Sequence, residues 1–97
     1  MDHIMARIKG AKMDEIKSAL RADAAEHAKQ GLTLRHVWRN ADDPEEIVFI
    51  FTAADLGRAR KFIEDAHEHV RKQNPSATLP QMLFLKGEQT SNVTMVK

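Results

Sequence analysis

The chain has 97 residues, of which 42% are hydrophobic and 30% charged, the size and composition of one globular domain. Fifteen Lys and Arg stand against fourteen Asp and Glu, so the net charge of +1 does not favour nucleic acid or an anionic membrane as a partner. The absence of cysteine excludes disulfides and cysteine-held metal centres. No apolar run approaches the roughly 18 residues of a membrane span, and we expect a cytoplasmic protein.

The first third of the chain changes its hydrophobic period once. Residues 3–9 alternate between apolar and mixed side chains, the two-residue period of a β-strand. From Met13 to Ala28 the apolar residues recur every three or four positions, which predicts one amphipathic helix. Gly31 is the expected helix stop.

The middle of the chain predicts two strands joined by a turn. Residues 32–40 have extended character, and strict alternation would place three side chains on one face: Leu34, His36 and Trp38. Residues 40–45 gather turn formers, so the chain should reverse there. Residues 47–51 are all apolar, which predicts a strand covered on both faces.

A second helix and a fourth strand follow. Asp55 is a plausible N-cap for an apolar stripe that runs from Leu56 to Val70, and the pair Asn74-Pro75 should end the helix. Residues 81–86 alternate again. The order βαββαβ predicts one α+β domain over residues 1–87, with residues 88–97 as a C-terminal tail or arm.

The turn and the start of the second helix carry a resemblance to a known family. The turn, R-N-A-D-D-P-E-E at residues 39–46, is followed by D-L-G-R-A-R-K-F at residues 55–62. This combination resembles a group of small, mostly uncharacterised bacterial proteins of the dimeric α/β-barrel superfamily. The resemblance implies a ferredoxin-like sandwich with an antiparallel sheet in the order 4-1-3-2, both helices on one face and a second subunit on the other.

The superfamily includes cofactor-free monooxygenases, haem-degrading enzymes and isomerases, so the fold does not fix one activity. The monooxygenase-like members carry a histidine three residues after the leucine that opens the second helix. In this chain that leucine matches Leu56, and the histidine position is Ala59. The departure counts against a monooxygenase or haem assignment, and no cofactor is expected.

The apolar strand at residues 47–51 also predicts a partner subunit. Two helices can cover one face of the sheet, and the other face would expose an apolar patch that monomers rarely tolerate. We therefore expect a homodimer with its sheets face to face. An RNA-recognition module shares the element order, but residues 46–49 lack the basic residue and glycines of its motif.

The candidate site lies on the first predicted helix. His27 falls within the apolar stripe, and Asp23, four residues earlier, is within reach of it. A carboxylate beside an imidazole suits a general base, so both are candidate catalytic and ligand-binding residues. The alternative is a histidine satisfied by a local hydrogen bond. Trp38 is a candidate third wall of the site, with packing in the core or dimer as its alternative.

No metal site is predicted. A two-residue step on a helix separates His67 from His69 by about 200°, so one ion cannot easily use both, and they are interpreted as boundary residues. Three functions stay open: a small-molecule binding protein, a cofactor-independent enzyme acting on a small apolar or aromatic substrate, and a purely structural dimer. A ligand would lie between the first helix and the sheet.

Overall fold

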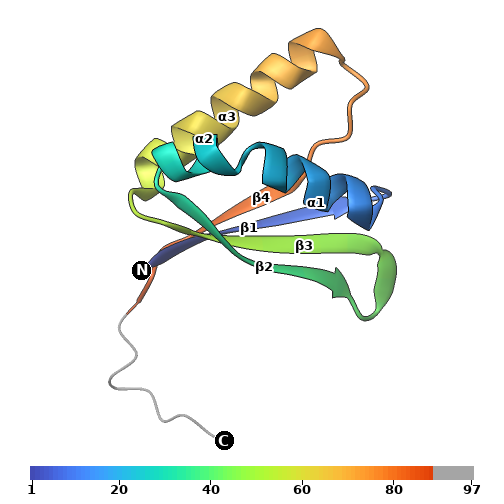
Figure 1. Cartoon of the computed structure of the whole chain (residues 1–97), viewed down its shortest axis with the longest axis horizontal. Coiled ribbons are helices and arrows are strands. Elements are labelled where there is room, and N and C mark those ends of the chain that lie inside the picture. The colour runs from blue at the N-terminus through green and yellow to red at the C-terminus, as the bar shows by residue number, and fades with distance from the viewer. Residues whose placement is uncertain (89–97) are drawn as a thin grey trace, which may run out of the picture.

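A computed structural model describes residues 1–88, in which three helices lie on one face of a four-stranded antiparallel sheet (Figure 1). In chain order the elements are β1 (Asp2–Lys9), α1 (Met13–Ala22), α2 (Ala24–Lys29), β2 (Leu32–Asn40), β3 (Asp43–Ala53), α3 (Leu56–Gln73) and β4 (Gln81–Leu85). The strands lie in the order β2-β3-β1-β4, which confirms the predicted α+β class and the 4-1-3-2 arrangement. Apart from Glu88, the predicted tail at 88–97 lies outside the described residues.

The hydrophobic core lies between the sheet and the helices. Ile4 and Ala6 of β1 and Ile47 of β3 are fully buried, because these central strands point alternate side chains toward the helix layer. Ala59 and Ile63 of α3 close the core from above. The period of two in β1 and of 3.6 in α3 therefore identifies the buried faces of these elements correctly.

The first predicted helix is divided into two. Asp23 has ψ near 1°, far from the value of about −42° that continues a helix, and it stands between α1 and α2. Backbone hydrogen bonds from Asp23 to Ala19 and from His27 to Asp23 bridge the break at 3.0 and 2.9 Å. The single helix expected over residues 13–28 is thus corrected to two segments. The second segment, α2, lies above the start of β2 and beside the first turns of α3 (Figure 1).

Strand β2 departs from the predicted alternation. Leu34 pairs with Phe51, but His36 already pairs with Ile50, so Arg35 is an extra residue in a β-bulge. The bulge reverses the faces of the residues after it. Leu34 therefore points toward the helices, whereas His36 and Trp38 point to the opposite face, and the expectation that these three share a face is wrong.

The turn between β2 and β3 is shorter than predicted. Asn40 pairs directly with Asp43, so only Ala41 and Asp42 form the loop. Pro44 falls inside β3, within a second irregularity of the ladder, where the missing N–H removes no regular hydrogen bond. Its carbonyl accepts a 2.6 Å hydrogen bond from Arg39, which fixes the loop to β2.

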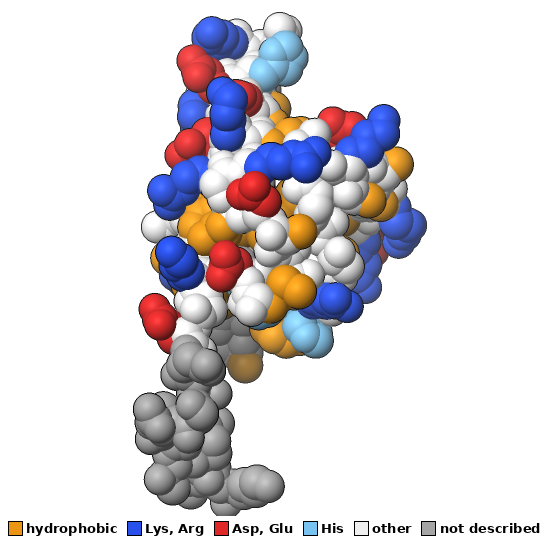
Figure 2. All heavy atoms as spheres, turned by 90° about the vertical axis from the view of Figure 1, so that its left-hand side faces the viewer, with side chains coloured by type: hydrophobic (Ala, Val, Ile, Leu, Met, Phe, Trp, Pro, Cys, Tyr) orange, Lys and Arg blue, Asp and Glu red, His pale blue; other side chains and the backbone are white. Residues whose placement is uncertain are grey.

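Helix α3 begins as predicted, because the Asp55 carboxylate accepts a hydrogen bond from the Arg58 backbone N–H at 3.1 Å. Its outer side carries intermixed acidic and basic side chains (Figure 2). Two ion pairs at i,i+4 spacing order some of them: Lys61 with Asp65 at 3.4 Å and Lys72 with Glu68 at 3.6 Å. Within residues 1–88, no helix combines the length and apolar character that crossing a bilayer requires.

Candidate ligand-binding site

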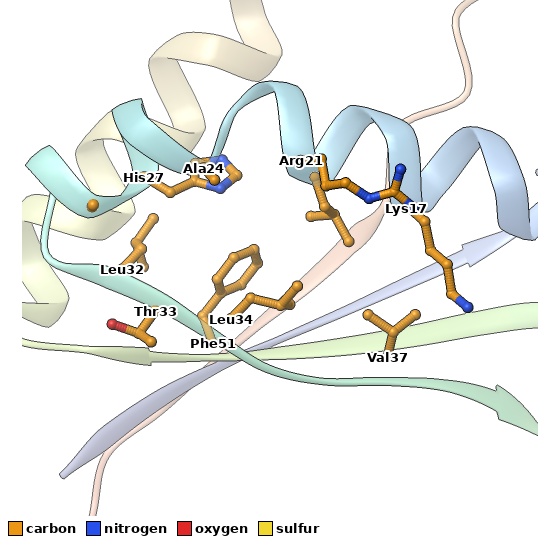
Figure 3. Close-up of a pocket in the computed structure, with 11 residues that line it drawn as sticks. Lys17, Arg21, Ala24, His27, Leu32, Thr33, Leu34, Val37 and Phe51 are labelled. Atoms are coloured by element: carbon orange, nitrogen blue, oxygen red, sulfur yellow. The ribbon is translucent and has the colours of Figure 1, made fainter.

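A cavity of about 390 Å³ lies between α1 and α2 above and strands β2 and β3 below (Figure 3). We call it the main cavity, a name that does not refer to size, since a more open and more polar hollow of about 520 Å³ lies beside the start of α1. Its lining is mostly apolar and comes from both layers: Lys17, Leu20, Arg21, Ala24, His27, Ala28, Leu32, Thr33, Leu34, Val37 and Phe51. Its volume lies within the range of about 300 to 1,000 Å³ of small-molecule sites.

His27 projects from α2 into this region, above the sheet (Figure 3). Its ring meets Phe51 edge to face with centroids 5.2 Å apart, and Phe62 in the same geometry at 6.2 Å. Burial lowers the pKa of His27 below its ordinary value, although the charges of Asp23 and Glu26 act in the opposite direction. The imidazole is therefore neutral at pH 7, with one ring nitrogen able to donate and the other able to accept.

The imidazole of His27 has no hydrogen-bond partner among residues 1–88. In the same part of the chain, no fully buried side-chain nitrogen or oxygen lacks a partner. The ring nitrogens of His27 therefore retain access to the surrounding space. A half-buried histidine with free nitrogens beside an apolar cavity differs from a core histidine that is sealed and internally satisfied.

Asp23 does not orient His27 by direct contact. Asp23 is exposed, and within the described chain its carboxylate makes neither an ion pair nor a hydrogen bond with the imidazole. The backbone N–H of His27 still donates to the Asp23 carbonyl at 2.9 Å, so the two residues lie one turn apart and only their side chains do not meet. The Asp23 carboxylate acts on the imidazole through its charge.

Two further cavities adjoin His27, and both are also lined by His67, which the sequence pattern indicated as a boundary residue of its helix. A space of about 310 Å³ between the helices and the sheet contains Asp23, His27 and His67. A space of about 320 Å³ between α2 and α3 contains the same three residues. Burial, helped by the charge of Arg71, lowers the pKa of His67 as well. In the sequence, the only indication of this role is that His67 lies between Ile63 and Val70 on the apolar stripe of α3, which faces α2.

The sequence did not indicate Lys17 and Arg21 as site residues, but both line the main cavity. Both extend from α1 and lie at the end of the main cavity away from His27, where Lys17 reaches toward Val37 of the sheet (Figure 3). On a helix their four-residue spacing indicates only a solvated face. Their relation to an apolar cavity depends on β2, whose bulge turns Val37 toward the helices.

Trp38 belongs to the other face of the sheet. It pairs with Val48 and stacks on His36 with ring centroids 4.6 Å apart and planes at 13°. The sheet separates it from Asp23 and His27, so the structure does not bring the three candidate site residues together. The cause is again the bulge at Arg35, which the assumption of strict alternation does not allow.

Arg58 fixes the position of α2. Its guanidinium donates to the Lys29 carbonyl at 2.7 Å and to the Gln30 side-chain oxygen at 3.3 Å. These bonds connect the end of α2 to the first turn of α3, and thereby hold the segment that carries His27 over the sheet. Next to them, Gly31 adopts φ of +75°, which allows the chain to pass from α2 into β2.

Within residues 1–88, no three His, Asp or Glu side chains gather as potential metal ligands. Comparison of the chain with protein-family models, with curated proteins and with solved structures gives no match. What the site can do follows from its own side chains: an apolar volume, a neutral imidazole and two cations at one end.

Proposed function

We propose that this protein binds a small organic molecule in the main cavity between α1, α2 and the sheet. The observation that carries the proposal is the free imidazole of His27 beside a mostly apolar volume of about 390 Å³. Because the ring nitrogens of His27 are accessible and have no partner within residues 1–88, a bound molecule can hydrogen-bond to them directly. The apolar walls contribute affinity, and His27 contributes a directed hydrogen bond.

A catalytic form of this function is favoured by one observation. Asp23, His27 and His67 line the same two adjoining cavities, and burial keeps both histidines neutral at pH 7. A neutral imidazole can accept a proton from a bound substrate, and the nearby carboxylate would stabilise the imidazolium that forms. This form describes a cofactor-independent enzyme in which His27 is the base.

We further propose that the protein forms a homodimer of the dimeric α/β-barrel type through the sheet face opposite the helices. That face, which we call the open face, carries apolar side chains from all four strands: Met5, Trp38, Val48, Ile50, Leu83 and Leu85. Trp38, Leu83 and Leu85 are 49%, 45% and 40% exposed, and covering them would remove apolar area from water. A second copy offers a face of the same shape.

Native mass spectrometry of the purified protein tests the binding function directly. We expect part of the protein to have a mass larger than that of the 97-residue chain, because a small molecule stays bound, and to lose this extra mass on denaturation. His27→Leu should remove this added mass, because the variant keeps the volume but not the hydrogen bond. His69→Leu is the matched control, since His69 is exposed and should leave the bound mass unchanged.

Retention of the same molecule by His27→Leu would contradict the role of His27.

Light scattering tests the dimer, with an expected particle of twice the 11.0 kDa chain at micromolar concentration. A dimer that never carries or takes up a small molecule would favour the purely structural function. A bound molecule that is converted by the wild type, and retained without conversion by His27→Gln, would favour the enzyme.

A further inference from the structure

We infer that the molecule bound in the main cavity carries a carboxylate or another single anionic group at one end, held by Lys17 and Arg21 of α1. This inference rests on the proposed binding function and names the class of its ligand. The rest of such a molecule is mostly apolar, extends over Phe51 and presents to His27 the uncharged polar group that the imidazole hydrogen-bonds.

In the described part of the chain, neither Lys17 nor Arg21 has an acidic partner. Within residues 1–88, the ion pairs involve Arg7, Lys9, Lys61 and Lys72, and neither Lys17 nor Arg21 is among them. Asp14, one turn before Lys17, makes no ion pair with it at 4.0 Å or less. Two like charges four residues apart on a helix repel each other, and an anion between them converts that repulsion into attraction.

The two cations lie beside apolar side chains of the main cavity. Lys17 extends from α1 toward Val37, so its ammonium group stands above an apolar part of the sheet (Figure 3). Leu34, also in the lining, is 39% exposed although its pairing with Phe51 points it toward the helices. Cations beside uncovered apolar side chains match a molecule that has a charged head and an apolar body.

The charges around the main cavity differ between its two ends. The guanidinium of Arg21 can donate two parallel hydrogen bonds to one carboxylate, and Lys17 adds a point charge. Among the described lining residues, His27 is the titratable side chain at the other end, and Asp23 and Glu26 contribute negative charge beside it. A second anionic group at that end would be repelled, so the geometry favours one anion and not a dianion.

The experiment compares matched pairs of carboxylates and neutral amides of the same shape: benzoate with benzamide, and 1-naphthoate with 1-naphthamide. Dissociation constants are measured by calorimetry or by titration of backbone amide shifts. We expect the carboxylate of a pair to bind about five to ten times more tightly than its amide. This preference should shrink as salt rises from about 50 to about 500 mM, because the cations are exposed to solvent.

The double variant Lys17→Met, Arg21→Met should abolish the preference and leave the affinity for the amides within about twofold. The control is Lys29→Met, Lys86→Met, which also changes the net charge from +1 to −1 but removes exposed cations outside the main cavity. It should keep the preference. A preference lost equally in both double variants would show a general charge effect and overturn the inference.

The outcomes separate this inference from the function on which it rests. One outcome is that the benzamide-type and benzoate-type ligands bind equally well to the wild type and shift the backbone amide resonances of Leu34, Val37 and Phe51. In that case the binding function stands and the preference for an anionic ligand is excluded. If no member of the panel binds at millimolar concentration, or the shifts map to the open face, the binding function fails together with the inference. A carboxylate preference that survives in Lys17→Met, Arg21→Met would exclude these two residues as its cause.

Discussion

The edge of the His27 imidazole meets the Phe51 ring at an interplanar angle of 82°, with centroids 5.2 Å apart. This contact joins α2 to β3 across the main cavity, between residues that are remote in the sequence. It places a titratable ring against the apolar floor of the site. Most consequences of the structure for function depend on keeping that ring neutral and in place.

The free energy of unfolding should fall as the pH drops below about 6.5. Burial lowers the pKa of His27 and of His67 in the folded state. The unfolded chain therefore takes up protons first, and stability declines between the ordinary histidine pKa and the lowered folded values. Chemical denaturation between about pH 7.5 and 5.5 checks this.

The double variant His27→Gln, His67→Gln should show a flatter dependence in this window. The carboxylates do not interfere, because the pKa values of Asp43 and Glu46 are lowered and these groups titrate in more acidic solution. His69→Gln measures the effect of removing a histidine outside the cavities. Stability that rises on acidification from pH 7.5 would contradict the assignment.

Substitution of Gly31 should cost more stability than the same change at Gly10. Both glycines have positive φ, +75° and +80°, where an L-residue costs about 1 to 2 kcal/mol. A Cβ on Gly31 would also meet the Ala54 Cβ at 3.1 Å, whereas one on Gly10 has open space. Thermal unfolding of Gly31→Ala and Gly10→Ala separates the steric cost from the conformational one. Equal losses in the two variants would exclude the close packing at Gly31.

Loss of the Arg58 side chain should weaken ligand binding without direct contact to the ligand. Arg58→Met removes the hydrogen bonds to Lys29 and Gln30 that hold α2, at a cost of about 1 kcal/mol in stability. Hydrogen exchange should increase in α2 before it increases in α3. Arg58→Lys retains the charge but cannot reproduce the fork, so it should show most of the same effect. Unchanged exchange in α2 would contradict this role.

Glu46 should matter more for stability than its neighbour Glu45. The Glu46 carboxylate is buried and accepts hydrogen bonds from Asn40 at 2.9 Å and from Arg7 at 3.2 and 3.1 Å, which hold its pKa below the ordinary value. Glu46→Gln should therefore lower stability at pH 7. It should also reduce the loss of stability as the pH falls below about 4.5, because the ionised form stabilises the fold. Urea denaturation of Glu46→Gln beside Glu45→Gln tests this.

The proposed dimer should depend on Trp38. Trp38→Lys places a charge on the open face and should raise the dimer dissociation constant at least about tenfold. Because the side chain is 49% exposed in the monomer, the variant should keep the circular dichroism spectrum of the wild type. Ala25→Lys adds the same charge on the helix layer and serves as the control. Equal dissociation constants for the two variants, by analytical ultracentrifugation, would exclude the open face as the interface.

Local patterning in the sequence determined the four strands, α3 and the fold class, but not the break between α1 and α2. Alternation at residues 3–9 and the helical stripe of α3 are properties of neighbouring residues, so they can be read without knowledge of the rest of the chain. The strand order was expected from a resemblance, since periodicity gives the elements and not their arrangement. The N-cap at Asp55 was also readable, because capping acts within one turn.

The tertiary structure alone decided the faces of β2 and the composition of the site. One inserted residue at Arg35 reverses every side chain after it, which moved Trp38 to the open face and Val37 to the main cavity. In the apolar pattern of β2, only the three-residue spacing from Leu34 to Val37, in place of the two-residue spacing of a regular strand, indicates the bulge. A cavity depends on the distance between layers, and sequence spacing does not encode that distance. His67 joins His27, and Lys17 stands above Val37, because packing brings together elements whose local patterns are independent of each other.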